Sequence, residues 1–379
     1  MVTKNRDELA TTELKCQALA IVEAGIERVL PDNIMRSALS YDPISRSLKI
    51  NDSTYQVVNG RIFVIGGGKA SGLMAEALEG IVGLKDIFTG IVNCKGGAYR
   101  TKRIKIIKAG HPIPDRSGLN GMKEMLDLKD KHSINENDLV ICLVSGGGSA
   151  LMPCPVDGIS LEDKQKTTQL LLDCGADIHE INAVRKHLSR TKGGRLGEFY
   201  SPTKVVSLII SDVIGDNLDT IASGPTYPDS STFEDAYGVL EKYDLTDSVP
   251  QSVLAYLKKG CRGEVTETPK SLTNCHNHII GNNRLALEAM EQKAAELGFK
   301  PLIVTAEQEG DTAEAAYMRA REIVAGKHQG YNAILLGGET TPRLPANAGK
   351  GGRNQHYAAV SMLAMKSYSG NWVAASVGT

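Results

Sequence analysis

Four glycine-rich loops constrain the fold of this chain more than any other feature of its sequence. Three of them directly follow apolar runs, at residues 61–65, 139–144 and 333–336. Such runs are typical of strands buried in a parallel sheet. Glycine lets backbone N–H groups approach an anion, and two of the loops carry a Lys or Arg, which indicates an enzyme that handles phosphates. The loops read Gly66-Gly67-Gly68-Lys69, Ser145-Gly146-Gly147-Gly148-Ser149, Gly337-Gly338-Glu339-Thr340 and Gly349-Lys350-Gly351-Gly352-Arg353.

Strand-like runs alternate with helical patterns along the chain, which predicts an α/β protein with a mostly parallel sheet. A first helix is expected over 14–29, because apolar residues recur there at helical spacing before Pro31. The polar, poorly periodic stretch 260–275 is the predicted boundary between two domains, 1–262 and 276–379. A strand is expected over 372–377. Since a helix would normally follow it, we expect the protein to continue beyond residue 379.

Composition excludes several classes of protein. The net charge of −1 argues against nucleic-acid binding through a basic face. The N-terminus lacks the apolar segment of a signal peptide, and no apolar run approaches the roughly 20 residues of a membrane span. None of the seven cysteines forms a Cys-x-x-Cys pair, so we expect reduced thiols and a cytoplasmic location. The oligomeric state stays open.

The loop ending in Lys69 fits two known phosphate motifs poorly. Phe63 and Ala70 stand where a Walker P-loop needs Gly and Ser or Thr. A dinucleotide fingerprint would need Gly at position 71, which is Ser, and an acidic residue near Lys95. Close packing of a strand on a helix is therefore the structural alternative to anion binding. Lys69 shifts the balance toward function, because a cation at a helix N-terminus is electrostatically unfavourable and needs a compensating anion or a functional reason.

Other polar clusters are candidates for a site, each with a structural alternative. The 145–149 loop offers consecutive N–H donors and two hydroxyls for an anion, or is a turn. Asp212 and Asp216 follow a predicted strand and suit Mg²⁺, or Asp212 caps a helix. Asn182, Lys186 and Arg190 share a predicted helix face that is either functional or solvated.

Histidines are weaker candidates. His276 and His278 alternate on a strand, but without a third ligand a structural role is favoured. His111 lies in a turn rich in proline and lines a site or shapes the turn.

Seven segments, in order, resemble the class II glycerate kinase family, whose C-terminal part is called the MOFRL domain. They extend from about residue 60 to the end of the chain. They are 66–70, 109–115, 145–151, 182–189, 211–216 with 223–226, 337–340 and 351–355.

The resemblance implies a two-domain protein with its active site in the cleft between the domains. Residues 1–262 would be a Rossmann-like glycerate kinase domain, and 276–379 a MOFRL-like α/β domain that ends early. The family's catalytic Lys and Arg correspond to Lys69 and Arg353, which we expect on opposite walls of the cleft. His356 stands where the family usually has an acidic residue.

The predicted function is therefore ATP-dependent phosphorylation of D-glycerate, on the 2-hydroxyl, with Mg²⁺ or Mn²⁺. Asp212 and Asp216 would hold the metal, and Asp212 is also a candidate catalytic residue that accepts the hydroxyl proton. The predicted substrate- and phosphate-binding residues are Gly67, Gly68, Ser145, Gly146, Gly147, Gly148, Ser149, Asn182, Lys186, Glu339 and Thr340. The alternatives are a hydroxypyruvate reductase and a non-catalytic sensor of small anions. Sequence leaves open 2- versus 3-phosphorylation, the donor nucleotide and the identity of the general base.

Overall fold

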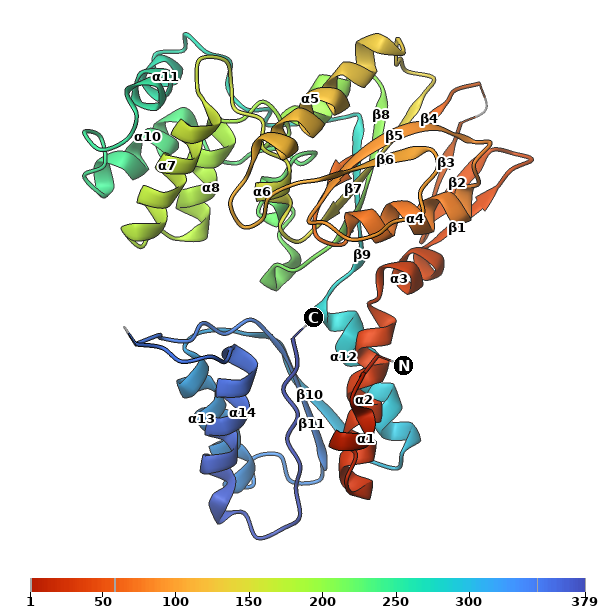
Figure 1. The fold of residues 1–379 in the computed structure, drawn as a ribbon, viewed down its shortest axis with the longest axis vertical. Helices are drawn as coiled ribbons and strands as arrows, with labels where there is room; N and C mark the ends of the chain where they lie inside the picture. The colour runs from red at the N-terminus through yellow and green to blue at the C-terminus, as the bar shows by residue number, and fades with distance from the viewer. Residues whose placement is uncertain (1, 58, 346, 379) are drawn as a thin grey trace. The chain divides into compact units, whose positions relative to one another are not determined.

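The computed structural model describes residues 2–57, 59–345 and 347–378, and the chain forms two compact units. The larger unit comprises Ile34–Ile280 (Figure 1). The smaller unit joins the N-terminal segment up to Asn33 with the chain from Gly281 onward.

A six-stranded sheet in the order β6-β5-β4-β7-β8-β9 forms the centre of the larger unit. The pairs from β6 to β8 are parallel, which confirms the predicted α/β architecture. β4 and β7 are buried along their whole length, as their apolar runs predict. The strands are β4 (Ile62–Gly67), β5 (Ile87–Cys94), β6 (Ile104–Lys108), β7 (Leu139–Ser145), β8 (Lys204–Ile210) and β9 (Cys275–Gly281).

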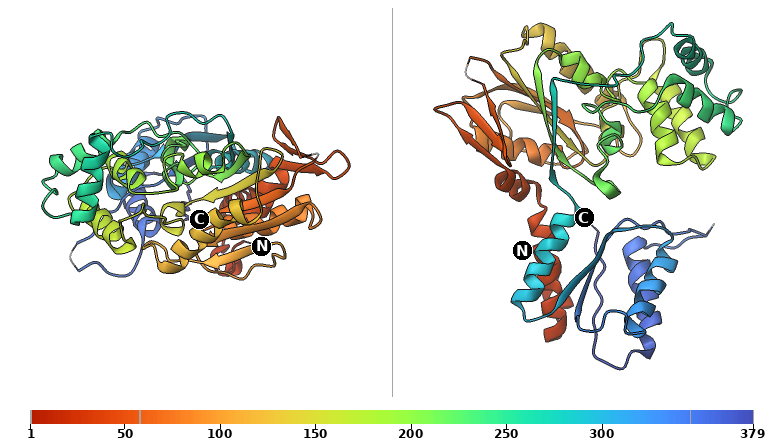
Figure 2. Two further views of the ribbon diagram at one scale, coloured as in Figure 1. Left: turned by 90° about the horizontal axis from the view of Figure 1, so that it is seen from above. Right: turned by 180° about the vertical axis from the view of Figure 1, so that it is seen from behind.

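Helices cover this sheet and form a cluster beside it. The helices next to the sheet are α4 (Ser71–Val82), α5 (Arg116–Lys131), α6 (Gly148–Leu151) and α9 (Arg195–Tyr200). The cluster consists of α7 (Leu161–Asp173), α8 (Ile178–His187), α10 (Phe233–Lys242) and α11 (Gln251–Cys261). Figure 2 shows the cluster to one side of the sheet, and residues such as Val184, Phe233 and Leu240 give it an apolar core. Short turns η1 (Ile214–Asp216) and η2 (Ile221–Ser223) follow β8.

A three-stranded antiparallel sheet precedes β4 and was not predicted. It consists of β1 (Leu39–Asp42), β2 (Ser47–Ile50) and β3 (Ser53–Gln56), and follows α3 (Pro31–Ala38). These strands are short and half-exposed, so they lack a long apolar run. Pro31 follows the expected first helix but also opens the next one, where its missing N–H costs nothing.

The smaller unit contains the parallel pair β10 (Pro301–Gln308) and β11 (Ala333–Gly338). Figure 1 shows α2 (Glu13–Arg28) and α12 (Asn283–Glu296) on one side of the pair and α13 (Thr312–Val324) and α14 (Arg353–Ala364) on the other. The short elements α1 (Arg6–Leu9) and η3 (Met365–Ser367) complete this unit.

The long N-terminal helix α2 belongs to the smaller unit because it packs on α12. A Cβ atom on Gly25 would lie 2.6 Å from Cγ of Met290, so the two helices approach closely at this glycine. Ile21 and Leu287 share one apolar core. The compact units thus divide the chain at 33/34 and 280/281, whereas the predicted domain boundary lies at 260–275.

The expected strand over 372–377 is absent from the described residues, and this prediction is wrong. An apolar run forms a strand only where a neighbouring strand accepts its backbone hydrogen bonds. Here the segment is instead attached through a side chain, because the Ser376 hydroxyl donates to Oδ1 of Asn354 (2.9 Å). Within the described part of the chain, no helix combines the length and apolarity needed to cross a membrane.

Candidate functional site

Three neighbouring strands of the larger unit end beside one another, and each leads into a predicted functional loop. β4 leads to Lys69, β7 to the 145–149 loop, and β8 to Asp212. Ligands of open α/β sheets bind at such carboxyl ends. The parallel register of β4, β7 and β8 therefore brings together residues that lie up to about 140 positions apart in the sequence.

Lys69 and Asp212 form an ion pair at this edge. The Lys69 ammonium nitrogen lies 3.9 Å from Oδ2 of Asp212, and both side chains are about half exposed (49% each). The backbone fixes Lys69, since its N–H donates to the carbonyl of Gly146 (2.8 Å). The next N–H, of Ala70, donates to Oγ of Ser145 (3.0 Å). Asp212 is the anion that a cation just before a helix requires, as expected.

The glycines of the first two loops let the strand ends approach closely. A Cβ atom on Gly68 would lie 2.1 Å from Oγ of Ser145, and one on Gly146 would lie 2.0 Å from Oδ2 of Asp212. Gly66 faces the carbonyl of Leu143 at 2.1 Å in the same way. Both Gly66 and Gly68 also have positive φ angles, 134° and 159°, which other residues rarely adopt. Close packing of β4 on β7 therefore explains these two glycines.

His111 faces the same loops. A Cβ atom on Gly147 would lie 2.8 Å from Nε2 of His111 and 3.2 Å from Cγ of Lys69. Its Nδ1 is buried and has no hydrogen-bond partner among the described residues. Burial lowers the pKa of His111, and the positive charges of Lys69 and Lys95 add to this effect, while Asp212 opposes it. These effects favour the neutral form of the imidazole, and the position of His111 beside Gly147 and Lys69 favours the site-lining interpretation.

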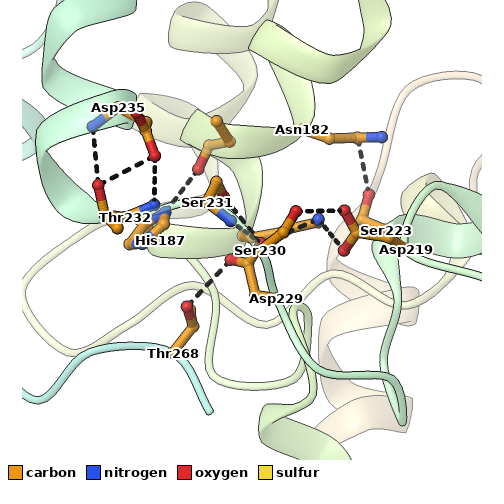
Figure 3. A network of polar contacts seen from close by, with 12 residues as sticks. Asn182, His187, Asp219, Ser223, Asp229, Ser230, Ser231, Thr232, Asp235 and Thr268 are labelled. Carbon is orange, nitrogen blue, oxygen red and sulfur yellow. Dashed lines mark hydrogen bonds and ion pairs between the residues drawn. The ribbon is translucent and has the colours of Figure 1, made fainter. Parts of the chain in front are cut away.

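A chain of hydroxyls connects the 145–149 loop to α8. Oγ of Ser149 and Oγ of Ser223 lie 2.7 Å apart, and the Ser223 hydroxyl donates to Oδ1 of Asn182 (3.0 Å; Figure 3). Ser149 therefore donates to Ser223. Nδ2 of Asn182 is buried without a partner among the described atoms. The predicted residues Ser149 and Asn182 thus belong to one network, joined by Ser223.

Lys186 lies further along α8 in a buried ion network. Its side chain is 3% exposed, and its ammonium pairs with Asp219 and, at 3.1 Å, with Asp229. Burial would raise the pKa of Asp229, but the Lys186 charge and hydrogen bonds from Ser231 hold it below its usual value. Thr268 also donates to Asp229 (3.0 Å; Figure 3). Because two carboxylates hold its ammonium, Lys186 positions the turns after β8, and its predicted role in substrate binding stays a prediction.

Asp216 lies four residues after Asp212, within η1, and has a φ of 54° next to Gly215 at 77°. The described residues contain no group of three or more His, Cys, Asp or Glu side chains arranged to hold a metal ion. The donors present are thus two loop carboxylates at the sheet edge. This set fits Mg²⁺, which is often held by one or two carboxylates with phosphate oxygens as further ligands.

A second polar cluster lies in the smaller unit. Arg353 is the first residue of α14 and pairs with Glu339, which follows β11; their side chains are 43% and 58% exposed. Thr340 is turned into the unit, where its hydroxyl lies 3.0 Å from that of Thr312. Two of the predicted candidates, Arg353 and Glu339, therefore lie together, while Thr340 contacts the start of α13.

The remaining candidates have local partners. α8 ends at His187, so Arg190 lies beyond it, and its guanidinium is 3.6 Å from Asp157. Nε2 of His278 lies 2.6 Å from the Tyr55 hydroxyl, and the His276 ring also packs against Tyr55. These contacts agree with the structural interpretation of both histidines.

Two residues of the network were absent from the predicted site. They are Ser223 and Lys192. The Ser223 hydroxyl lies 2.7 Å from that of Ser149, and Nζ of Lys192 contacts the carbonyl of the neighbouring Ala222 (3.4 Å). The available signal was a lysine directly before two glycines, Lys192-Gly193-Gly194, with positive φ angles of 56° and 81° at the glycines. Their contacts depend on the tertiary fold.

Comparison with known proteins assigns the chain to a family. Residues 17–258 match the family described as a domain of unknown function (DUF4147). A glycerate 2-kinase from Pyrococcus horikoshii is 43% identical over 354 residues, which cover 90% of this chain and 79% of that protein. A putative hydroxypyruvate reductase from Agrobacterium vitis is 37% identical over 328 residues, which cover 83% of this chain and 72% of that protein.

The fold has a counterpart among solved structures. The crystal structure of a glycerate kinase from Thermotoga maritima superimposes with a TM-score of 0.79 at 38% identity, over 93% of this chain and 80% of that one. With the sequence relatives and the ordered motifs, this similarity shows that the chain belongs to the class II glycerate kinase family.

Proposed function

We propose that the protein is a glycerate kinase that transfers a phosphoryl group from ATP to D-glycerate, on the 2-hydroxyl. The observation that carries the proposal is the Lys69–Asp212 pair, 3.9 Å apart among glycine loops at the sheet edge, in a chain 43% identical to a glycerate 2-kinase. Phosphoryl transfer depends mainly on positioning and on neutralising charge around the phosphoryl group. A half-exposed ammonium beside a carboxylate supplies a cation and a proton acceptor at one place.

Each polar residue of the site then has a proposed role. Lys69 neutralises the transferring phosphoryl group, and Arg353 remains a proposed catalytic cation. Asp212 holds Mg²⁺ together with Asp216, or accepts the proton of the attacking hydroxyl. When bound, Mg²⁺ would neutralise the nucleotide phosphates. Gly67, Gly68 and the 145–149 loop line the site.

The reductase alternative fits the first glycine loop poorly. A dinucleotide-binding loop uses glycine so that its backbone can approach a pyrophosphate. Here Gly66 and Gly68 face the backbone and side chain of β7 instead, since a Cβ atom on either would lie 2.1 Å from Leu143 O or Ser145 Oγ, respectively. β5 also ends in Asn93 and Cys94, followed by Lys95, so no acidic residue is available for a ribose.

The test measures nucleotide consumption. A glycerate kinase consumes ATP in proportion to added D-glycerate, a reductase oxidises NADH with hydroxypyruvate, and a sensor does neither. Oxidation of NADH without ATP consumption would overturn the proposal.

A further inference from the structure

Lys192 is a buried lysine without an acidic partner. Its side chain is almost wholly enclosed (residue 2% exposed), yet it forms no ion pair with a carboxylate of the described residues. Among the described residues, Nζ forms one hydrogen bond, a long one to the carbonyl of Ala222 (3.4 Å). The nearby Lys186 has two carboxylates. Enclosing an ammonium without an anion is costly, and an anion bound here would offset that cost.

A second unsatisfied group contacts the same turn, η2. Asn182 is 3% exposed, and its amide Nδ2 is buried without a partner in the described residues, while its Oδ1 accepts from Ser223. A buried donor without an acceptor is rare and costly. An anion would accept a hydrogen bond from this amide and would also pair with the ammonium of Lys192.

Backbone contacts hold these groups to the glycine loop of the site. The N–H of Gly193, next to Lys192, donates to the carbonyl of Ser223 (2.9 Å), and that of Gly194 donates to Gly224 (2.6 Å). Ser149, partly exposed, reaches the same turn through the Ser223 hydroxyl. Ser149 therefore connects the enclosed groups to the loop where Gly147 borders Lys69 and His111.

We propose that Lys192 and Asn182 form the subsite that holds the carboxylate of the acceptor substrate, and that Ser149 links this subsite to the 145–149 loop. The assignment of that carboxylate to glycerate rests on the proposed function. A carboxylate supplies the anion that Lys192 lacks and the acceptor that Asn182 lacks, and places the rest of a small hydroxy acid toward Lys69.

The charges around Lys192 give the subsite a measurable signature. Burial lowers the pKa of Lys192 well below its usual value, and the positive charges of Lys164 on α7 and Arg185 on α8 lower it further, while Cys154 opposes them. A bound carboxylate favours the charged form and raises the pKa again. Binding of D-glycerate should therefore take up protons from the buffer.

The experiment is calorimetric titration of the full chain with D-glycerate at pH 8, in buffers that differ in ionisation enthalpy. For the wild type we expect binding with proton uptake. For Lys192→Met we expect affinity about 10- to 100-fold lower, the range for losing a hydrogen bond to a charged group, and no proton uptake. ATP affinity should be unchanged.

Two further variants separate binding from folding. Lys164→Met removes another buried lysine, whose ammonium donates to the carbonyls of Arg185 and Leu188 among the described residues, and it should not lower the affinity for D-glycerate. Asn182→Asp keeps the size and the acceptor for Ser223 but adds a negative charge, so it should weaken D-glycerate binding even if Lys192→Met fails to fold.

Unchanged D-glycerate affinity in folded Lys192→Met or Asn182→Asp protein would overturn the subsite. An equal loss of D-glycerate affinity in Lys164→Met would also overturn it. So would a Lys192→Met protein that loses affinity for ATP instead of D-glycerate. Absence of D-glycerate binding by the wild type would overturn it as well. Turnover of D-glycerate by the wild type is measured in a separate assay and tests the proposed function. Turnover with unaltered binding in the variants would leave the proposed function standing and the subsite refuted.

Discussion

At the scale of single residues, the site depends on side chains whose backbone is fixed before any ligand arrives. Lys69 is held through its own N–H and that of Ala70, which bind Gly146 and Ser145. Preorganised charge of this kind stabilises a transition state without further reorganisation. The sequence indicated Lys69, Asp212 and the glycine loops, because their motifs are local. It did not indicate Lys192 and Ser223 as site residues, because their partners come from distant segments.

Lys69→Ala should lower kcat by a factor on the order of 10²–10³, because one preorganised electrostatic contact to the phosphoryl group is lost. The measurement is steady-state kinetics with D-glycerate and ATP. Lys85→Ala, at an exposed lysine outside the loop, is the matched control and should keep the wild-type kcat. A well-folded Lys69→Ala protein with normal kcat would remove Lys69 from the mechanism.

At the scale of elements, buried runs were predictable and short exposed strands were not. β4, β7 and β8 are mostly apolar and mostly buried, so their burial fixes both their type and their place in the sheet. β1 to β3 alternate in burial over four residues each, which gives too little pattern to separate them from loops. The run at 372–377 shows that an apolar pattern alone does not make a strand. A strand there would need a neighbouring strand to pair with, and the described residues do not provide one.

Lys186 joins α8 to the turns that follow β8, so its removal should destabilise the larger unit strongly. Lys186→Met leaves Asp229, whose side chain is fully buried, without its cation, and the expected loss is about 3–5 kcal/mol of unfolding free energy. Lys242→Met breaks an exposed pair with Glu180 and should cost at most about 1 kcal/mol. Urea unfolding measures both. Similar losses in the two variants would contradict this account of the network.

Lys164 should give the stability a distinct pH dependence. Burial lowers its pKa to about 7, against 10.5 for the free side chain, with Arg185 and Arg195 adding to the effect and Cys154 opposing it. Between these values the unfolded chain binds the proton that the folded protein has lost, so stability rises with pH from about 7 to 10.5. Unfolding free energies across this range should show a smaller slope in Lys164→Met. An identical slope would mean that Lys164 keeps an ordinary pKa in the folded protein.

At the scale of the whole molecule, the function should require a divalent metal. Asp212 and Asp216 are two carboxylates in one loop, and oxygen ligands with nucleotide phosphates suit Mg²⁺ or Mn²⁺. Activity should therefore disappear in excess EDTA and return on adding Mg²⁺, while Zn²⁺ should not be retained after dialysis. Full activity in EDTA would refute the metal assignment.

The central claim is that this chain phosphorylates the 2-hydroxyl of D-glycerate. The direct measurement is phosphorus NMR of the product formed from ATP, Mg²⁺ and D-glycerate by the purified protein. We predict one new phosphomonoester signal that coincides with added 2-phosphoglycerate and grows as ATP is consumed. A signal that coincides with 3-phosphoglycerate, or the absence of any phosphorylated product, would contradict the account.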